Sequence, residues 1–424
     1  MKNDKKKILT HIGVLRGAIN RIKTILENLW VGIESGVIQR DPHIILFGAW
    51  MGSKFADNSR FLFQYLSKNK DVLGLKRVIW VTRNPKVVTM LRDMGYESYL
   101  CGTKESRYWH LKSGVHIICN ATNRQGHEAD IDIQYSWGAK KIQLWHGVGM
   151  KSVGAIANEQ VSRGNAGRLW KRIKSNRFLN MLMSEGGWGE AFFLTTSPVK
   201  LKICQAIAAC SEESMFISNY PRNCRCIELL SSEVSVIEEI EKYDGAVFYL
   251  PTFRKDYSSY VHPLTDDSVR QFLTEKNYLW IEKPHSASTY RFKVDSLKNV
   301  LYLDSDFDVN VLYPFVSTVI SDYSSAVFDA VYRNIPVIMY TPDLENFKNG
   351  NIGLTFDIET NCKVVIARNI KVLIEMLYKI EQRIYFQQNG IEEFYKHYRR
   401  EFWNNATASY DAIWNDIKNK AGID

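Results

Sequence analysis

The sequence predicts an α/β protein built from two doubly wound, Rossmann-like domains that face each other across a cleft. Two sets of short apolar runs alternate with helical stretches, and this pattern predicts two parallel sheets with helices on both faces. The crossing between the two sets falls around residues 211–244, and polar residues cluster where the runs end. Sheets of this kind bind ligands beyond the carboxyl ends of their strands, so these polar residues form the candidate site.

The composition is that of an ordinary globular protein, with a net charge of +9. No apolar run reaches the roughly 20 residues that span a bilayer, and no signal-peptide pattern opens the chain. Seven cysteines, mostly in apolar contexts, predict reduced and buried thiols in a cytoplasmic protein. The positive charge indicates an anionic partner, which could be nucleic acid, a phosphorylated substrate or an anionic lipid.

Residues 5–38 predict one long amphipathic helix, which we treat as a segment of its own over residues 1–40. Its apolar residues repeat at alternating steps of four and three, from Ile8 to Ile33. This spacing is typical of a coiled-coil seam, and it also suits a helix that lies on a membrane. We expect the seam, and therefore a homo-oligomer, with the interfacial helix as the alternative.

The first α/β domain is predicted over residues 41–215. Its strands are expected at residues 43–49, 77–82, 115–120 and 141–145, with helices at 58–68, 86–94 and 104–112. Residues 151–180 interrupt this alternation with basic side chains around Leu169 and Trp170, a composition typical of a helix in an anionic interface. The basic residues assigned to acceptor or membrane binding are Lys151, Arg168, Lys171, Arg172 and Lys174.

The second α/β domain is predicted over residues 216–380, followed by C-terminal helices over 381–424. Its strands are expected at residues 246–250, 278–282, 300–303, 316–320 and 336–340. The last of the strand-end motifs, Ser321-Asp322-Tyr323-Ser324-Ser325, precedes a helical pattern. One of the two serines would then cap the helix, where backbone N–H groups and hydroxyls could meet a phosphate. A cap that binds nothing is the plainer interpretation.

Three other strand ends carry residues suited to phosphate chemistry. Trp145-His146-Gly147 places a histidine after a buried strand, and histidine titrates in the range that suits a general base. Arg254 follows Pro251-Thr252-Phe253, and its planar guanidinium matches a phosphate. Lys283-Pro284-His285 ends the next strand. Taken singly, a structural histidine and a surface salt bridge would explain these residues as well.

Together the motifs resemble the CDP-glycerol glycerophosphotransferase family, which includes teichoic acid primases and polymerases and related capsule polymerases. The resemblance covers about residues 43–345 and rests on the order and spacing of five motifs: Trp-His-Gly at 145–147, Tyr-Pro-Arg-Asn at 220–223, Pro-Thr-Phe-Arg at 251–254, Lys-Pro-His at 283–285 and Ser-Asp-Tyr-Ser-Ser at 321–325. It implies a GT-B fold, with an acceptor domain followed by a donor domain. Departures include Val-Gly-Met after His146-Gly147 and Cys224 after Asn223.

The resemblance also implies a reaction and a site. A polyol phosphate, most simply glycerol phosphate, would move from a CDP-polyol to a hydroxyl of a lipid-linked or capsular acceptor, with release of CMP. This would occur at the cytoplasmic face of the membrane, which the protein would bind peripherally. The catalytic residues would be His146 as base, with Arg254 and His285 stabilising charge. The donor-binding residues would be Thr252, Arg254, Lys283, His285, Ser324, Ser325 and Asp329.

No cofactor and no protein-bound metal are expected, although Mg²⁺ could accompany the substrate. Asp329 could orient His285 or reach the ribose, and a structural role is the plainer interpretation for it and for Asp322. Two other function classes remain open at this stage. One is a GT-B glycosyltransferase that uses a nucleotide-sugar. The other is a non-enzymatic basic protein that binds membranes or nucleic acid, although the cleft motifs require no nucleic acid and we expect none as a partner.

Overall fold

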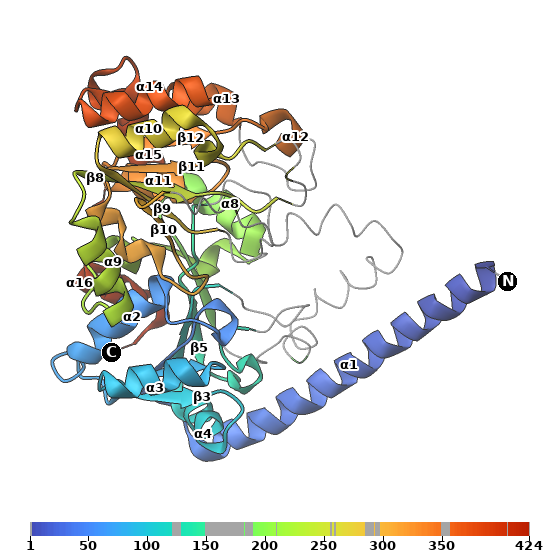
Figure 1. Ribbon diagram of the computed structural model, residues 1–424. Helices are drawn as coiled ribbons and strands as arrows, with labels where there is room; N and C mark the ends of the chain where they lie inside the picture. The colour runs from blue at the N-terminus through green and yellow to red at the C-terminus, as the bar shows by residue number, and fades with distance from the viewer. Residues whose placement is uncertain are drawn as a thin grey trace. The chain divides into compact units, whose positions relative to one another are not determined.

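A computed structural model describes residues 2–120, 129–148, 182, 190–208, 210–254, 257, 260–284, 292, 297–348, 357–404 and 406–423. Contacts between residues divide the chain into two compact units. The first comprises Met1–His146, Glu159–Leu194 and Trp414–Asp424, and the second comprises Gly147–Asn158 and Thr195–Ile413. Figure 1 shows that each unit is built around a sheet flanked by helices.

The first sheet has seven strands in the order β3-β2-β1-β4-β5-β6-β7. The pairings from β3 through β6 are parallel, as the alternation of strands and helices predicts. Strand β4 is buried at every position, which is the pattern of a strand covered on both faces. The strands are β1 (Asp41–Phe47), β2 (Arg77–Thr82), β3 (Ser98–Leu100), β4 (Ser113–Ile118), β5 (Lys140–Gln143), β6 (Ala191–Thr195) and β7 (Met215–Ile217).

The second sheet has six strands in the order β10-β9-β8-β11-β12-β13, again with parallel pairings. Strands β8 and β9 are buried at every position and form its apolar centre. The strands are β8 (Gly245–Leu250), β9 (Tyr278–Glu282), β10 (Val300–Tyr302), β11 (Thr318–Ser321), β12 (Val337–Tyr340) and β13 (Ile366–Ala367).

Helices connect the strands of both sheets, which is the architecture predicted from the sequence. The helices that precede β4 in the sequence are α1 (Lys2–Ile38), α2 (Asp57–Lys68), α3 (Pro85–Asp93) and α4 (Lys104–Lys112). Those that follow are α8 (Pro198–Ala208), α9 (Ser231–Ile240), α10 (Asp267–Glu275), α11 (Ala326–Tyr332), α12 (Leu344–Lys348), α13 (Ile358–Asn361), α14 (Ile370–Glu381), α15 (Ile391–Trp403) and α16 (Tyr410–Ala421).

Helix α1 confirms the predicted N-terminal helix and is anchored to the first unit by its C-terminal half. Asn28 donates to the carbonyl of Leu182, and Glu34 forms an ion pair with Arg107 of α4. After the helix, Arg40 donates to the carbonyls of His110, Ser113, Tyr135 and Trp137. These bonds fix where the helix ends and the first strand begins.

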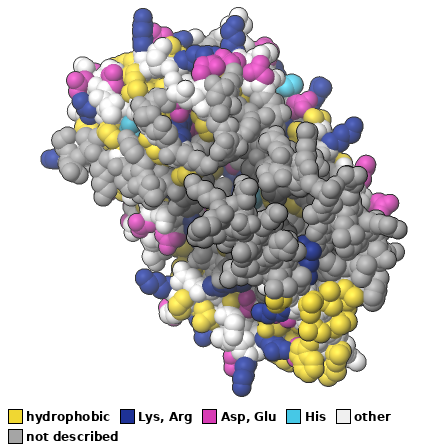
Figure 2. Space-filling view, turned by 90° about the vertical axis from the view of Figure 1, so that its right-hand side faces the viewer, with side chains coloured by type: hydrophobic (Ala, Val, Ile, Leu, Met, Phe, Trp, Pro, Cys, Tyr) yellow, Lys and Arg dark blue, Asp and Glu magenta, His cyan; other side chains and the backbone are white. Residues whose placement is uncertain are grey.

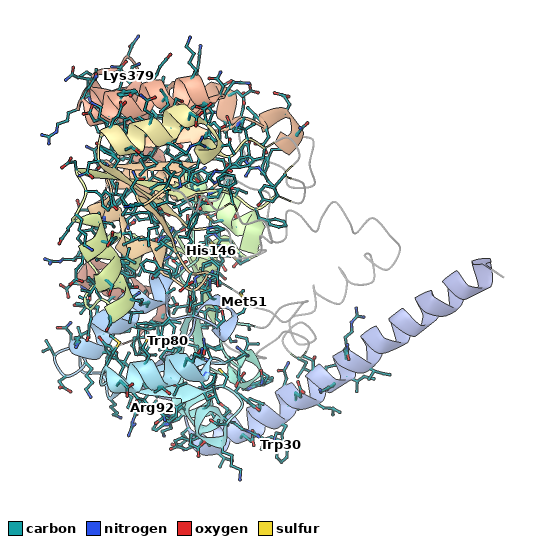
Figure 3. The ribbon with its side chains drawn as sticks, viewed as in Figure 1. Trp30, Met51, Trp80, Arg92, His146 and Lys379 are labelled. Atoms are coloured by element: carbon teal, nitrogen blue, oxygen red, sulfur yellow. The ribbon has the colours of Figure 1, made fainter. Side chains whose placement is uncertain are left out.

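The opposite face of α1 is apolar and exposed. Seven side chains on it have exposed fractions between 45% and 78%: Ile19, Ile22, Leu26, Leu29, Trp30, Ile33 and Val37. Trp30 points away from the sheet in Figure 3, and hydrophobic side chains gather in Figure 2 on the side toward which α1 extends. No helix in the described part of the chain is both long enough and apolar enough to cross a bilayer.

Candidate functional site

His146 follows strand β5 in the first unit, and a backbone carbonyl holds its ring. The Nδ1 atom lies 3.2 Å from the carbonyl oxygen of Cys119, which follows β4. A carbonyl oxygen only accepts a hydrogen bond, so in the neutral ring Nδ1 carries the proton and Nε2 is the basic nitrogen. His146 therefore lies at the predicted strand end, and its ring has the tautomer that a general base needs.

Aromatic rings surround this histidine. The centroid of the Trp145 ring lies 4.4 Å from that of His146, and the Trp50 ring lies 6.3 Å away. The ammonium of Lys54 is 5.0 Å from the centre of the Trp50 ring. Figure 3 shows His146 and Met51 of the first unit, each of which follows the end of a strand of its sheet. The segment of residues 50–58, which follows β1, therefore lies beside His146.

Backbone strain is concentrated around His146. Four residues there adopt positive φ although none is glycine: Trp50 (47°), Met51 (54°), Asp57 (65°) and Trp145 (61°). Such conformations are costly for bulky residues and gather at functional sites, where the surrounding structure enforces them. The side-chain amide of Asn58 donates to the Trp145 carbonyl over 2.7 Å, which helps to hold the strained peptide before His146.

Asp130 organises this region, and no motif in the sequence points to it. Its carboxylate accepts the N–H groups of Met51, Cys119 and Asn120 over 2.7–3.0 Å. These residues follow two neighbouring strands, β1 and β4. One buried carboxylate therefore fixes the position of the loop that carries Met51. It also fixes the segment whose Cys119 carbonyl contacts His146.

In the second unit, the two serines play different parts. The Ser324 hydroxyl accepts the N–H of Ala326 over 3.3 Å, whereas Ser325 is the N-cap residue and makes no capping bond with its side chain. Helix α11 has only seven residues, so its N-terminus offers little dipole. The Ser325 hydroxyl instead lies against Gly147, where an added Cβ would come within 2.5 Å of it.

The Tyr-Pro-Arg-Asn motif connects Gly147 to the serine motif. The hydroxyl of Tyr220 donates to the carbonyl oxygen of Gly147 over 3.0 Å. Arg222 binds both carboxylate oxygens of Asp329 at 2.9 Å, and both side chains are buried. This ion pair favours a structural role for Asp329, and its contact with His285 or the ribose stays a prediction.

Arg254 is also committed to protein partners. It reaches Asp343 through Nε (2.5 Å) and Nη2 (3.0 Å), and Asp322 through Nη1 (2.7 Å). Nη1 also donates to the carbonyl of Thr252. Three guanidinium N–H groups donate to these partners, and Nη1 also lies within ion-pair distance of Asp322. The contact with a phosphate therefore stays a prediction that must compete with partners inside the fold.

Lys283 and Thr252 lie where the sequence placed them, at the ends of β9 and β8. Lys283 is half-buried, and Thr252 is buried with its N–H bonded to Asp322. The preceding residue, Glu282, accepts hydrogen bonds from Trp280 and from His262. Sequence reasoning missed His262, because nothing in its own segment indicates a partner 20 residues away. The remaining predicted residues, His285, Lys151, Arg168, Lys171, Arg172 and Lys174, lie outside the described residues.

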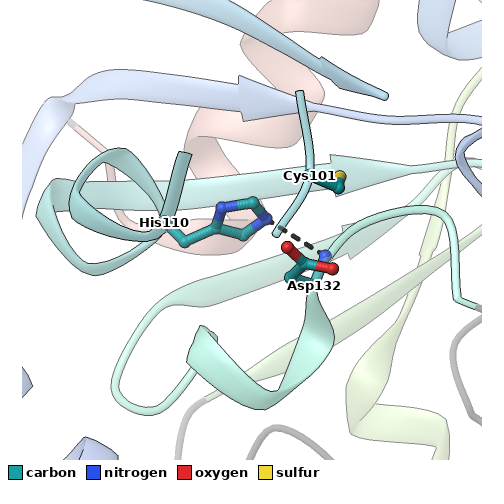
Figure 4. A group of neighbouring side chains, drawn as sticks. All are labelled: Cys101, His110 and Asp132. Carbon is teal, nitrogen blue, oxygen red and sulfur yellow. Dashed lines mark hydrogen bonds between the residues drawn. The ribbon is translucent and has the colours of Figure 1, made fainter. Parts of the chain in front are cut away.

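Among the described residues, one group of candidate metal ligands comes together: Cys101, His110 and Asp132 (Figure 4). His110 donates from Nδ1 to the Ser106 carbonyl, and its Nε2 accepts the N–H of Asp132 over 3.1 Å. The Asp132 carboxylate already binds Arg83 and the N–H of Gly102. A metal would displace these bonds and leave buried donors unpaired. The three side chains are therefore better explained as a hydrogen-bonded cluster than as a metal site.

Comparison with known proteins identifies the family. A model described as "CDP-Glycerol:Poly(glycerophosphate) glycerophosphotransferase" matches residues 34–410. The chain belongs to this family. It is 24% identical to a teichoic acid poly(glycerol phosphate) polymerase of Bacillus spizizenii, over 85% of this chain and 89% of that protein. It is also 24% identical to a teichoic acid glycerol-phosphate transferase of Staphylococcus aureus, over 81% and 85% of the two chains.

The solved structure of the wall teichoic acid polymerase TagF matches with a TM-score of 0.65 and 17% identity, over 99% of both chains. This likeness confirms the predicted GT-B fold. Membership of the glycerophosphotransferase family identifies the chain as a transferase. A non-enzymatic binding protein and a nucleotide-sugar glycosyltransferase are therefore set aside.

Proposed function

We propose that this glycerophosphotransferase moves glycerol phosphate from CDP-glycerol to a hydroxyl group of a teichoic-acid-like or capsular acceptor and releases CMP. The proposal rests on the contact between Nδ1 of His146 and the Cys119 carbonyl, because this contact leaves Nε2 as the nitrogen that can accept a proton. It also rests on the family to which the chain belongs. The relatives named above act on poly(glycerol phosphate) or glycerol phosphate, which favours glycerol over other polyols.

The reaction is a displacement at phosphorus. The acceptor oxygen attacks the glycerol-bearing phosphorus, its proton passes to Nε2 of His146, and the bond from that phosphorus to the oxygen of CMP breaks. Charge that builds on the leaving phosphate needs positive or hydrogen-bonding groups close by. Lys283, His285 and the hydroxyls of Ser324 and Ser325 would supply them. Mg²⁺ would travel with the donor phosphates, and we assign it no ligand from the protein.

The acceptor is proposed to be anchored in the membrane, with the enzyme bound peripherally at the cytoplasmic face. The basic segment from Lys151 to Lys174 would hold the chain there by attraction to anionic lipid. Reversing the charges of Lys171, Arg172 and Lys174 should abolish co-sedimentation with anionic liposomes. Co-sedimentation that survives this change would remove the segment from membrane binding.

The apolar face of α1 is proposed to pair with the same face of a second copy. The apolar residues of α1 repeat at alternating steps of four and three, which suits a seam with another helix. The helix is basic overall, so a helix that lies on an anionic membrane is the alternative. Changing Leu26 and Ile33 to Asn should lower the mass seen by light scattering. The matched control is Val72→Asn, an apolar residue that is 89% exposed elsewhere. Loss of liposome binding at unchanged mass would make α1 a lipid-binding helix instead.

The donor is tested by a screen of CDP-glycerol, CDP-ribitol and several UDP-sugars with the purified protein and a glycerol phosphate primer. The proposal expects CMP to be released from CDP-glycerol and transferred glycerol phosphate to appear on the primer. Release of UDP from a nucleotide-sugar, without CMP from any CDP-alcohol, would overturn it.

A further inference from the structure

We propose that Arg254 and Asp343 are positioning residues that hold the donor-binding strand ends in place, and that Arg254 is not itself a ligand of the donor phosphates. The inference rests on the proposed function for the location of the donor, and it deepens that function. Asp343 follows β12 and belongs to none of the motifs that revealed the family. Its role comes from contacts within the second unit alone.

Asp322 is the centre of the arrangement. Both of its carboxylate oxygens accept the N–H of Thr252, at 2.9 and 3.1 Å, and one accepts the N–H of Tyr323 at 2.7 Å. Thr252 follows β8, and Asp322 itself follows the neighbouring strand β11. The carboxylate thus sets the distance between the Pro-Thr-Phe-Arg loop and the turn that carries Ser324 and Ser325.

Arg254 and Asp343 extend this connection to a third strand end. Asp343 binds Arg254 at two points, and one of its oxygens also accepts the Tyr323 hydroxyl at 3.0 Å. The Tyr323 ring stacks on Phe347 of α12 with centroids 3.7 Å apart. The ends of β8, β11 and β12 are therefore tied by one buried cation and two buried carboxylates.

Charge argues against a direct role of Arg254 in phosphate binding. Burial alone would lower the pKa of Arg254, but Asp322 and Asp343 outweigh it and raise the pKa above its ordinary value. One guanidinium faces two carboxylates, so a diphosphate brought to this cluster would meet net negative charge. An arginine that binds phosphate needs N–H groups that are not already held by acids.

The decisive variant is Asp343→Asn, measured by calorimetry with CDP. Asparagine keeps the shape and one acceptor oxygen but loses the charge and the two-point bond to Arg254. If Arg254 positions the strand ends, CDP affinity should fall by about tenfold, the scale of one charge-assisted bond. If Arg254 binds phosphate directly, Asp343 competes with the donor, and the variant should bind CDP as tightly as the wild type or more tightly. That result would overturn the proposal.

The control variant is Glu381→Gln, which breaks the ion pair with Lys276 (3.1 Å) in the same unit. Lys276 lies just before β9, at the amino ends of the strands, so CDP affinity should not change. If Asp343→Asn fails to fold, Tyr323→Phe removes only the hydroxyl bond to Asp343 and keeps the stacked ring. A severalfold loss of CDP affinity is expected, and unchanged affinity would again overturn the proposal.

Hydrogen exchange separates this inference from the proposed function. The amides of Thr252 and Tyr323 should exchange faster in Asp343→Asn, and in Glu381→Gln they should not. This readout needs no activity, so it stands even if the wild type releases no CMP and the proposed function fails. Unchanged exchange at both amides would refute the positioning role whatever the donor is.

Discussion

The strand end that carries His146 and the strand end that carries Arg254 are held by different means. Around His146, one backbone carbonyl, two aromatic rings and four positive-φ residues hold the side chain. Around Arg254, two buried carboxylates neutralise a charged one. The difference favours His146 as the candidate for proton transfer, because Arg254 is already paired with two acids inside the fold. A polar residue after a buried strand becomes a candidate for chemistry only after its partners have been counted.

The largest effect is expected where a buried charge loses its partner. Asp329→Ala leaves Arg222 buried without its two carboxylate bonds and should destabilise the protein by about 3–5 kcal/mol, the usual cost of breaking a buried pair. Chemical denaturation measures the loss. The exposed pair Lys396–Glu392 offers the control, since Glu392→Ala should leave the stability almost unchanged. A stable Asp329→Ala protein that has lost donor affinity would support the predicted contact of Asp329 with the ribose.

The second effect concerns the strand end that carries His146. His146→Ala should lower turnover by about 10² or more, the usual contribution of a general base, and should leave the affinity for CDP unchanged. CMP release and calorimetry measure the two quantities. His397→Ala, which changes an exposed histidine, is the control. Turnover close to that of the wild type would remove His146 from the reaction.

The sequence predicted most of the fold because the buried strands are continuous apolar runs. Residues 77–82 and 278–282 were predicted with the bounds that β2 and β9 have. The strands β3, β7 and β13, with two or three residues each, carry little pattern and were missed, as was β6. Strand β10 also has three residues, but it was predicted as part of the apolar run 300–303.

The sequence predicted where the candidate residues lie in the fold but not which residues they contact. His146 and Arg254 both follow strands as expected, yet Arg254 meets an acid 89 residues further along the chain. Asp343 and Asp130 have no local signature, since their role depends on which strands are neighbours in the sheet. Strand order is a property of the whole fold, so these acids could be found only in the structure.

A third prediction tests whether Gly147 must lack a side chain. In Gly147→Ala the new Cβ would lie 2.5 Å from the Ser325 hydroxyl and 3.2 Å from its Cβ. Overpacking of this kind should cost about 1–3 kcal/mol. Ser325→Gly combined with Gly147→Ala should recover most of the stability, because the clashing atoms are gone. Equal losses in the single and double variants would show that the two residues do not meet.

A fourth prediction concerns acid. Burial lowers the pKa of His116 well below its ordinary value, and Arg40 lowers it further. Below about pH 6.5 the unfolded chain binds a proton at this residue and the folded protein does not, so stability falls as the pH falls. Between pH 6.5 and 5.5 the loss from this residue should be about 1 kcal/mol. His116→Gln should flatten the dependence seen in denaturation curves. The exposed residue His397 is the control, and a slope that His116→Gln leaves unchanged would contradict the prediction.

The smallest effect is expected at Cys101, His110 and Asp132. The lone pair of His110 Nε2 is used by the N–H of Asp132, and both Asp132 oxygens have donors. Removing metal with a chelator, or adding Zn²⁺, should therefore shift the melting temperature by no more than about 1 °C, well under the shift for 1 kcal/mol. A clear stabilisation by Zn²⁺ that disappears in His110→Gln would show that the ion displaces these bonds.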